Sequence, residues 1–350
     1  MFVCNRKTSY FSHCCFVALV HQLDCDAPAD TFSSCERMLK ADVLRYLMWV
    51  FVVLTFGGNI FALMMRLTET DENRVQNLLV SSLCVSDMLM GIYLAGIINK
   101  EISTHGSYYQ YDLKWRGSSA CHAFGAFSVI SSEVSVFTLV FIAYDRFLHV
   151  VRALDFKEIK YGTAVILLAL TWTTCTIIAV IPSVIPPYFN NKIQNTGFYG
   201  TSSICLPLQL PGQNAIAWEY CLAIFGVLNF VAAIYLIVAY IRMFYSSYKS
   251  AHDAGNATRM NDHPKMATRF ASIVFTDVCC WVPIAMLLFL SLGRAVTDND
   301  NILYAYFSIC IIPINSAINP ILYTVGTPFF WRKIKAYFRN NFRCCNRGIY

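Results

Sequence analysis

The sequence predicts an all-α membrane protein, a seven-transmembrane helix bundle followed by a short amphipathic eighth helix. First, 57% of the 350 residues are hydrophobic and only 14% are charged. Second, a membrane-spanning helix needs about 20 mostly apolar residues, and seven such stretches occur along the chain. Third, the last stretch contains a proline and two amides between Asn315 and Tyr323. Such interruptions break the backbone hydrogen-bond ladder, which is typical of a membrane helix that changes shape.

The seven stretches are joined by short loops, so we expect a single bundle without a separate soluble domain. The expected spans are Tyr46–Met65, Leu78–Ile98, Ala120–Val150, Gly162–Ile185, Trp218–Ile241, Phe270–Leu292 and Ile302–Val325. The chain then divides into an extracellular cysteine-containing tail (1–42), the transmembrane domain (43–327) and a cytoplasmic amphipathic helix and tail (328–350).

The distribution of basic residues predicts the orientation. If the N-terminus is outside, the inner loops and tail hold 17 of the 27 Lys and Arg residues and the outer segments hold 10. The positive-inside rule therefore favours an extracellular N-terminus and a cytoplasmic C-terminus. The net charge of +6 then faces lipid and inner partners, and does not indicate nucleic-acid binding. A signal peptide at Cys14–Val20 is the alternative for the tail, but this run is short and lacks a small-residue cleavage site.

The fifteen cysteines sort by expected location. Those inside spans are expected to be small buried hydrophobic residues, whereas the outer ones lie where disulfides form. Cys121 begins the third span and Cys205 precedes the fifth, so a bridge between them would hold that loop over the mouth of the bundle. The tail keeps an odd number, which suggests a partner upstream in a larger ectodomain. These five are Cys4, Cys14, Cys15, Cys25 and Cys35.

Three acids, Asp87, Glu133 and Asp277, fall inside spans. Ionisable groups in a bilayer are costly and are functional candidates by default. Carboxylate, amide and hydroxyl oxygens suit a hard cation such as sodium, while the alternative is polar contact between helices without an ion. The prolines of the sixth and seventh spans favour a switch. The candidate sodium pocket comprises Asp87, Ser135, Asn315 and Asn319.

At the inner end of the third span stands Asp145-Arg146-Phe147. The acid can hold the arginine in an ion pair, whose release would free a cation at the cytoplasmic mouth. The alternative is an ordinary interfacial arginine, but the position 24 residues after Cys121 strengthens the first interpretation. In the sixth span, Pro283 allows a kink beside Trp281.

The segment Phe329–Arg339 alternates aromatic and basic residues. At helical spacing this pattern predicts an amphipathic helix on the anionic inner leaflet. Cys344 and Cys345 at its end are candidate S-acylation sites, and reduced thiols are the alternative.

Together these features resemble the rhodopsin-like (class A) G-protein-coupled receptors over about residues 43–340. The matching positions are Asn59, Leu83–Asp87, Cys121, Asp145-Arg146, Trp172, Trp281 with Pro283, and Asn319-Pro320 with Tyr323.

Finer features resemble one branch of that family, the receptors that contain leucine-rich repeats. Ser86–Leu94, Ser132–Val136 and Phe275–Asp277 carry this resemblance. Phe198–Leu208 and Cys280–Ile284 are most similar to relaxin-family peptide receptors. No leucine-rich repeats precede the hinge-like tail, so we expect a fragment, a short isoform or a truncated form.

Three departures concern the activation machinery. Phe147 replaces the usual tyrosine, the fifth span lacks a proline near Ala232, and His263 stands where many receptors place an acid. A lock between Arg146 and the sixth helix is therefore in doubt.

The resemblance implies a plasma-membrane receptor for a relaxin-like peptide hormone, signalling through the stimulatory G protein and adenylate cyclase. It implies no enzyme activity, no cofactor beyond the candidate sodium ion, contact with membrane lipids, and a candidate homo-oligomer. A truncated core that acts as a modulator or dimer partner is the alternative function. A transporter or channel would often show internal repeats, and an enzyme needs a catalytic set; neither pattern occurs.

The resemblance also implies roles for particular residues. In the off state, Asp145 pairs with Arg146 and Asp277 hydrogen-bonds Asn315. On activation, the sixth helix pivots near Pro283 and Arg146 meets the G protein. The implied switch residues are Asp277, Asn315, Trp281 and Pro283; the implied coupling residues are Asp145, Arg146, Phe147, Tyr240, Asn319, Pro320 and Tyr323.

Overall fold

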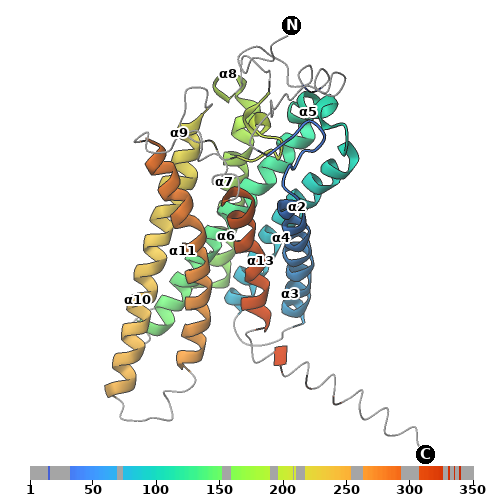
Figure 1. Ribbon diagram of the computed structural model, residues 1–350. Coiled ribbons are helices and arrows are strands. Elements are labelled where there is room, and N and C mark those ends of the chain that lie inside the picture. Colours follow the sequence, from blue (N-terminus) through green and yellow to red (C-terminus); the bar gives the residue numbers. More distant parts are fainter. Residues whose placement is uncertain are drawn as a thin grey trace, which may run out of the picture.

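The computed structural model forms a bundle of long helices (Figure 1). It describes residues 15, 32–68, 74–151, 159–189, 196–207, 209, 217–253, 263–292, 307–325, 330–331, 335 and 339. Among these residues, six helices are long and apolar enough to cross a membrane, and a shorter apolar helix covers Ile309–Pro320. The predicted seven-helix bundle is confirmed.

The seven helices follow in chain order. The first comprises α2 (Asp42–Val52), the π-helical turn η1 (Val53–Gly57) and α3 (Gly58–Leu67). The second, third and fourth are α4 (Arg74–Thr104), α6 (Ser119–Val151) and α7 (Tyr161–Val184). The fifth comprises α9 (Trp218–Cys221), the π-helical turn η3 (Leu222–Leu228) and α10 (Asn229–Asp253), and the sixth is α11 (His263–Leu292). The described seventh comprises η6 (Phe307–Ile311), α13 (Ile312–Pro320) and η7 (Ile321–Val325).

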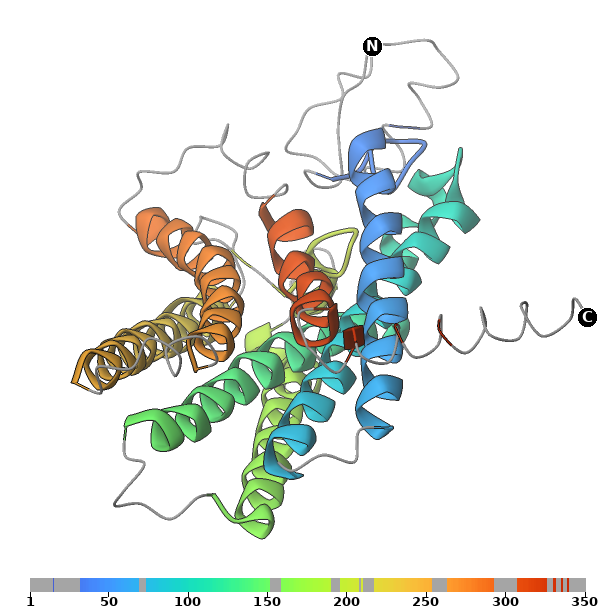
Figure 2. The same cartoon turned by 90° about the horizontal axis from the view of Figure 1, so that it is seen from below.

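The third helix, α6, is the centre of the bundle. In its most apolar window 78% of the residues are buried, against 22% in α7. Figure 2 shows α6 crossing the bundle at a tilt, with α4, α7 and α10 along its sides. Polar side chains on α6 are therefore withdrawn from lipid and must find partners inside the protein.

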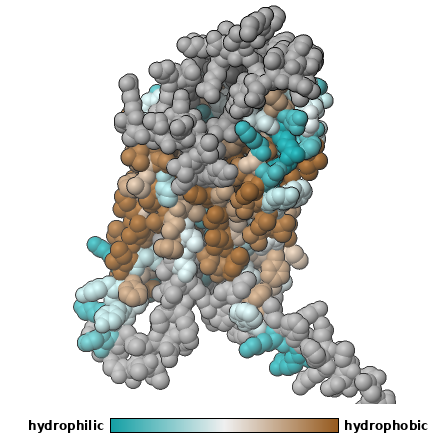
Figure 3. Space-filling view, viewed as in Figure 1, coloured by the Kyte–Doolittle hydropathy of each residue, from teal (hydrophilic) through white to brown (hydrophobic). Residues whose placement is uncertain are grey.

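The outer surface carries the apolar belt that a membrane requires. Figure 3 shows hydrophobic residues around the middle of the bundle and hydrophilic ones toward its ends. Large apolar side chains point outward at this level; they include Val53, Met64, Ile166, Leu170 and Val231.

Pro320 removes one backbone hydrogen bond from the seventh helix, and a side chain of the first helix supplies the missing donor. Pro320 has no N–H, so it leaves the carbonyl of Ser316 without its helical donor. The Asn59 side chain, buried in the first helix, donates to that carbonyl at 3.1 Å. The π-helical turn η7 follows directly after Pro320. The polar residue that the sequence places in the first span therefore has a structural partner.

The expected spans agree with the described helices, several of which extend further, and residues 302–306 of the expected seventh span lie outside the described residues. The third span, expected at Ala120–Val150, is Ser119–Val151. The second extends beyond its expected ends, to Arg74 and Thr104. A short helix, α5 (Tyr108–Arg116), forms in the loop before α6. The sequence left Trp172 open between lipid contact and packing; its indole N–H donates to Ser82 Oγ in α4 at 3.0 Å.

The described segment before α2 lies against the C-terminal end of α4. Glu101, near the end of α4, accepts hydrogen bonds from the backbone N–H groups of Met38 and Leu39 at 2.8 and 3.1 Å. A disulfide joins Cys15 to Cys35. The remaining tail cysteines, most of the predicted eighth helix, and Cys344 and Cys345 lie outside the described residues.

A candidate signalling switch in the bundle core

The sixth and seventh helices are joined by a buried hydrogen bond. Asn315 Nδ2 in α13 donates to Asp277 Oδ1 in α11 at 2.9 Å. Both side chains are buried, at 4% and 1% exposure. In the low-dielectric interior a hydrogen bond is electrostatically stronger than in water. The hydrogen bond predicted between Asp277 and Asn315 is therefore present.

A second amide ties the same helix to α4. Asn319 Nδ2 donates to Asp87 Oδ2 at 2.8 Å, and both side chains are fully buried. Asn315 and Asn319 are four residues apart and share one face of α13. The seventh helix is thereby fastened to the second helix and to the sixth from successive turns.

Each residue of the predicted sodium pocket carries a buried oxygen atom without a hydrogen bond in the described part of the chain. Ser135 and Ser316 lie beside its carboxylate. Among the described residues, Asp87 Oδ1, Ser135 Oγ, Asn315 Oδ1 and Asn319 Oδ1 are buried without a hydrogen-bond partner. Carboxylate, hydroxyl and amide oxygens are ligands for a hard monovalent cation, so this donor set fits the predicted sodium ion.

A further polar contact joins the third and fifth helices. Asn229 Nδ2 in α10 donates to Glu133 Oε1 at 3.2 Å, and both residues are buried. The sequence singled out Glu133 without a partner and overlooked Asn229. The available signal was an amide inside an apolar span, which in a membrane tends to bond across helices.

The indole of Trp281 is stacked rather than exposed to lipid. Its ring lies parallel to that of Phe225, with centroids 6.1 Å apart and an interplanar angle of 6°. Phe225 belongs to η3, where the fifth helix widens into a π-helical turn. Such turns are frequent at functional sites. Here the turn stands in a helix that lacks the proline of many class A receptors.

Near the C-terminal end of α6, Arg146 contacts Asp145 and Gln76. Asp145 Oδ2 lies 3.3 Å from Arg146 Nη2, which is the expected ion pair. The same nitrogen donates to Gln76 Oε1 in α4. Asp145 is 2% exposed and the arginine side chain 11%, so this cation is withdrawn from the surface at this end of the bundle. Gln76 was missed, because its contact arises from helix packing rather than from a motif.

Two further coupling candidates, Tyr240 and Phe147, have described side chains. Tyr240 in α10 is half-buried and packs against Ala143 and Leu236. Phe147 is half-buried as well. Tyr323 has its backbone in η7, and its side chain lies outside the described part, as do the side chains at 263–271.

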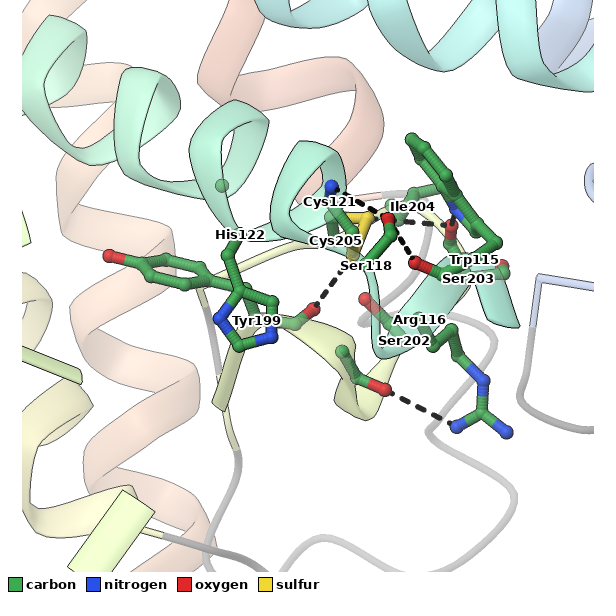
Figure 4. The surroundings of a disulfide bond; sticks show 12 residues. Trp115, Arg116, Ser118, Cys121, His122, Tyr199, Ser202, Ser203, Ile204 and Cys205 are labelled. Atoms are coloured by element: carbon green, nitrogen blue, oxygen red, sulfur yellow. Dashed lines mark hydrogen bonds between the residues drawn. A yellow bond between two sulfur atoms is a disulfide. The ribbon is translucent and has the colours of Figure 1, made fainter. Parts of the chain in front are cut away.

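A disulfide fastens the N-terminal end of α6 to the segment before the fifth helix. Cys121 at the start of α6 is bonded to Cys205, as predicted (Figure 4). Two residues before Cys205, the Ser203 carbonyl accepts a hydrogen bond from Trp115 Nε1 at 2.7 Å. Arg116, in a buried ion pair with Asp112 at 2.7 Å, donates to Gly200 O at 3.3 Å. The loop between the fourth and fifth helices is therefore fastened to α5 and α6.

The comparisons with known proteins agree with this geometry. Residues 58–323 match the family described as 7 transmembrane receptor (rhodopsin family). The chain belongs to the rhodopsin family of seven-transmembrane receptors. Because these proteins are receptors, the prediction that the chain is not an enzyme is confirmed, and the receptor is a multi-pass membrane protein.

Relaxin receptors are among its relatives. The receptor is 34% identical to relaxin receptor 1 and to relaxin receptor 2 of Homo sapiens, over 94% and 93% of this chain and 42% of each relative. It is also 34% identical to G-protein coupled receptor GRL101 of Lymnaea stagnalis, over 96% of this chain and 29% of that protein. The chain thus spans less than half the length of these relatives. The resemblance to relaxin-family receptors is confirmed.

Proposed function

We propose that this chain is the signalling core of a receptor for a relaxin-like peptide hormone, coupled through the stimulatory G protein to adenylate cyclase. Its similarity to two relaxin receptors along nearly the whole chain supports this proposal. The division at residues 42 and 327 into tail, bundle and inner helix forms part of the same proposal.

The proposed orientation places the N-terminal side outside the cell. Both described disulfides, Cys15–Cys35 and Cys121–Cys205, belong to one end of the bundle. Disulfides persist in the oxidising space outside the cell. Arg146 lies at the opposite end of α6, where a cytoplasmic partner would meet it. The basic aromatic segment and Cys344 and Cys345 then face the inner leaflet as lipid anchors.

The hydrogen bond between Asp277 and Asn315 is the observation that carries the proposal. It links the two helices between which a pivot near Pro283 would act. In the off state the bond holds α11 against α13; in the on state α11 moves outward and the bond is lost. A ligand shifts this equilibrium only by binding the on state more tightly, so hormone and G protein must strengthen each other's binding.

Arg146 is the proposed contact with the G protein. In the off state its charge is engaged by Asp145 and Gln76. Movement of α11 would open the inner end and free the guanidinium, while Tyr240 and Tyr323 turn inward beside it. Phe147, Asn319 and Pro320 complete the proposed coupling set. The contact with Gln76 supplies an off-state restraint that does not depend on the sixth helix.

A sodium ion is the proposed allosteric ligand of the core. Asp87, Ser135, Asn315 and Asn319 would hold it through the oxygens that lack partners among the described residues. The ion would supply a positive charge that offsets the buried Asp87 carboxylate. The four side chains come from α4, α6 and α13, so a site that requires all of them favours the packing in which they lie together.

Cyclic AMP in cells expressing the chain tests the proposal. Arg146→Ala and Asp277→Ala are compared with the parent at matched surface expression, with Tyr188→Phe as an outer-end control. We expect Asp277→Ala to raise basal cyclic AMP above the parent and Arg146→Ala to abolish it. Cyclic AMP equal to that of empty cells for every variant would instead favour a core that modulates a partner without signalling.

A further inference from the structure

The fourth helix carries a proline whose consequences reach two other elements. Pro182 lies inside α7. It has no N–H, so the carbonyl of Ile178, four residues earlier, loses its helical donor, and the proline ring crowds the same turn. A backbone carbonyl without a donor is costly inside a bilayer.

A tyrosine from the fifth helix supplies the missing donor. Tyr220 Oη in α9 donates to Ile178 O at 2.7 Å. The bond replaces the one that the proline removes, but its donor belongs to another helix. The start of the fifth helix is thereby fastened to the altered turn of the fourth.

A second tyrosine reaches the next carbonyl from the outer loop. Tyr199 Oη donates to Ala179 O at 2.6 Å. Tyr199 is fully buried in η2 (Phe198–Thr201), and burial raises the pKa of its hydroxyl well above the ordinary value. The hydroxyl therefore keeps the proton that it donates. Gly125 in α6 leaves room for this ring, because a Cβ there would collide with it.

The rings of the two tyrosines meet through one phenylalanine. Phe198 contacts Tyr199 edge-on at 5.2 Å and Tyr220 edge-on at 5.4 Å between centroids. Phe189, at the end of α8 (Pro186–Phe189), contacts Phe198 at 5.6 Å and Tyr220 at 5.5 Å. Edge-to-face packing of this kind fixes the direction in which each hydroxyl points.

We propose that Pro182 creates a docking point for Tyr220 at Ile178 O, and that Tyr199, bonded to the adjacent Ala179 O, fastens the second outer loop to the same turn of α7. The loop is also bonded to α6 through Cys205, and η3 with Phe225 follows Tyr220 by a few residues. A displacement of the loop is thereby transmitted to the fifth helix above the Trp281 stack. The docking point is a positioning device and stands independently of the G-protein proposal.

A double-mutant cycle tests the docking point. The full chain is purified in lipid nanodiscs, and its thermal unfolding midpoint is measured for the parent, Tyr220→Phe, Pro182→Ala and the double variant. Removing the hydroxyl leaves Ile178 O without a donor, so Tyr220→Phe lowers the midpoint in the parent. In the Pro182→Ala background, residue 182 regains its N–H and donates to Ile178 O, so the same change lowers the midpoint by less than half as much.

The control is Tyr188→Phe, a neighbouring tyrosine that is 51% exposed and whose hydroxyl bonds to Glu219 at 2.8 Å. It shifts the midpoint little and equally in both backgrounds. An equal loss for Tyr220→Phe in both backgrounds would show that the tyrosine acts by other contacts, and overturns the proposal. No loss in the parent also overturns it. Pro182→Leu restores the same N–H and replaces Pro182→Ala if that variant does not fold.

Discussion

The amide of Asn59 donates to the backbone carbonyl of Ser316, the group that Pro320 leaves without a helical donor. The first helix thus supplies a hydrogen-bond donor to the seventh at the turn where the proline interrupts its backbone hydrogen bonds. The proline can persist in the membrane because the freed carbonyl is satisfied from outside the helix.

Removing this amide should destabilise the bundle. Asn59→Ala leaves the Ser316 carbonyl unsatisfied, which costs roughly 1–3 kcal/mol for a buried group. In Pro320→Ala, the backbone N–H of residue 320 can take over as donor, so the further loss from Asn59→Ala should shrink. Thermal unfolding of the two single variants and the double variant measures this. Equal losses with and without Pro320 would contradict the assignment.

Gln76→Ala should raise basal cyclic AMP. The substitution removes the acceptor of an arginine hydrogen bond and leaves the Asp145 pair in place. A bond to a charged group contributes about 1.5–3 kcal/mol, so the restraint on Arg146 should weaken markedly. Asn77→Ala is a matched control, because the adjacent Asn77 side chain donates to Arg66 O instead. Basal signalling that stays at the parent level in Gln76→Ala would remove the proposed restraint.

Sodium should stabilise the receptor, and Asp87 should be required for the effect. When sodium replaces choline at constant ionic strength, the thermal unfolding midpoint of the parent should rise. An ion that binds only the folded state stabilises that state by mass action. Asp87→Asn should abolish the rise. Glu133→Gln, a similar change at an acid bonded to Asn229, should keep it. A rise that survives in Asp87→Asn would place the ion elsewhere.

The disulfide Cys121–Cys205 should be needed for surface expression. Cys121→Ser or Cys205→Ser removes the bridge and frees the loop that also contacts α5 through Ser203 and Gly200. Loss of a bridge of this kind typically costs about 2–5 kcal/mol. Cys175→Ser, which changes a buried free thiol in α7, is the control. Surface levels that fall equally in all three would argue against a specific role for the bridge.

The sequence predicted those parts of the receptor that depend on one segment at a time. The lengths of the apolar runs and the polar segments between them located the spans, because a helix in lipid must form its backbone hydrogen bonds within its own segment. The Asp277–Asn315 bond could be anticipated because polar groups inside spans must find one another, and the family resemblance paired them.

Contacts that depend on helix register could not be predicted. Gln76 meets Arg146, and Asn229 meets Glu133, only once α4 and α10 are placed against α6. Phe225 stacks on Trp281 from a π-helical turn, and no proline in the sequence indicates that this turn is there. The short helix α5 was missed because it is mixed in polarity, with no apolar run to reveal it.

The central claim is that the Asp277–Asn315 bond holds the off state, and a reciprocal exchange tests it most directly. Asn315→Asp replaces the amide donor with a second carboxyl group, and two adjacent carboxylates cannot both stay ionised, so the amide–carboxylate bond is lost and basal cyclic AMP should rise. Adding Asp277→Asn restores an amide opposite a carboxylate in the reverse sense, and basal cyclic AMP should return toward the parent level at matched surface expression. A double variant that signals as strongly as Asn315→Asp alone would contradict the account.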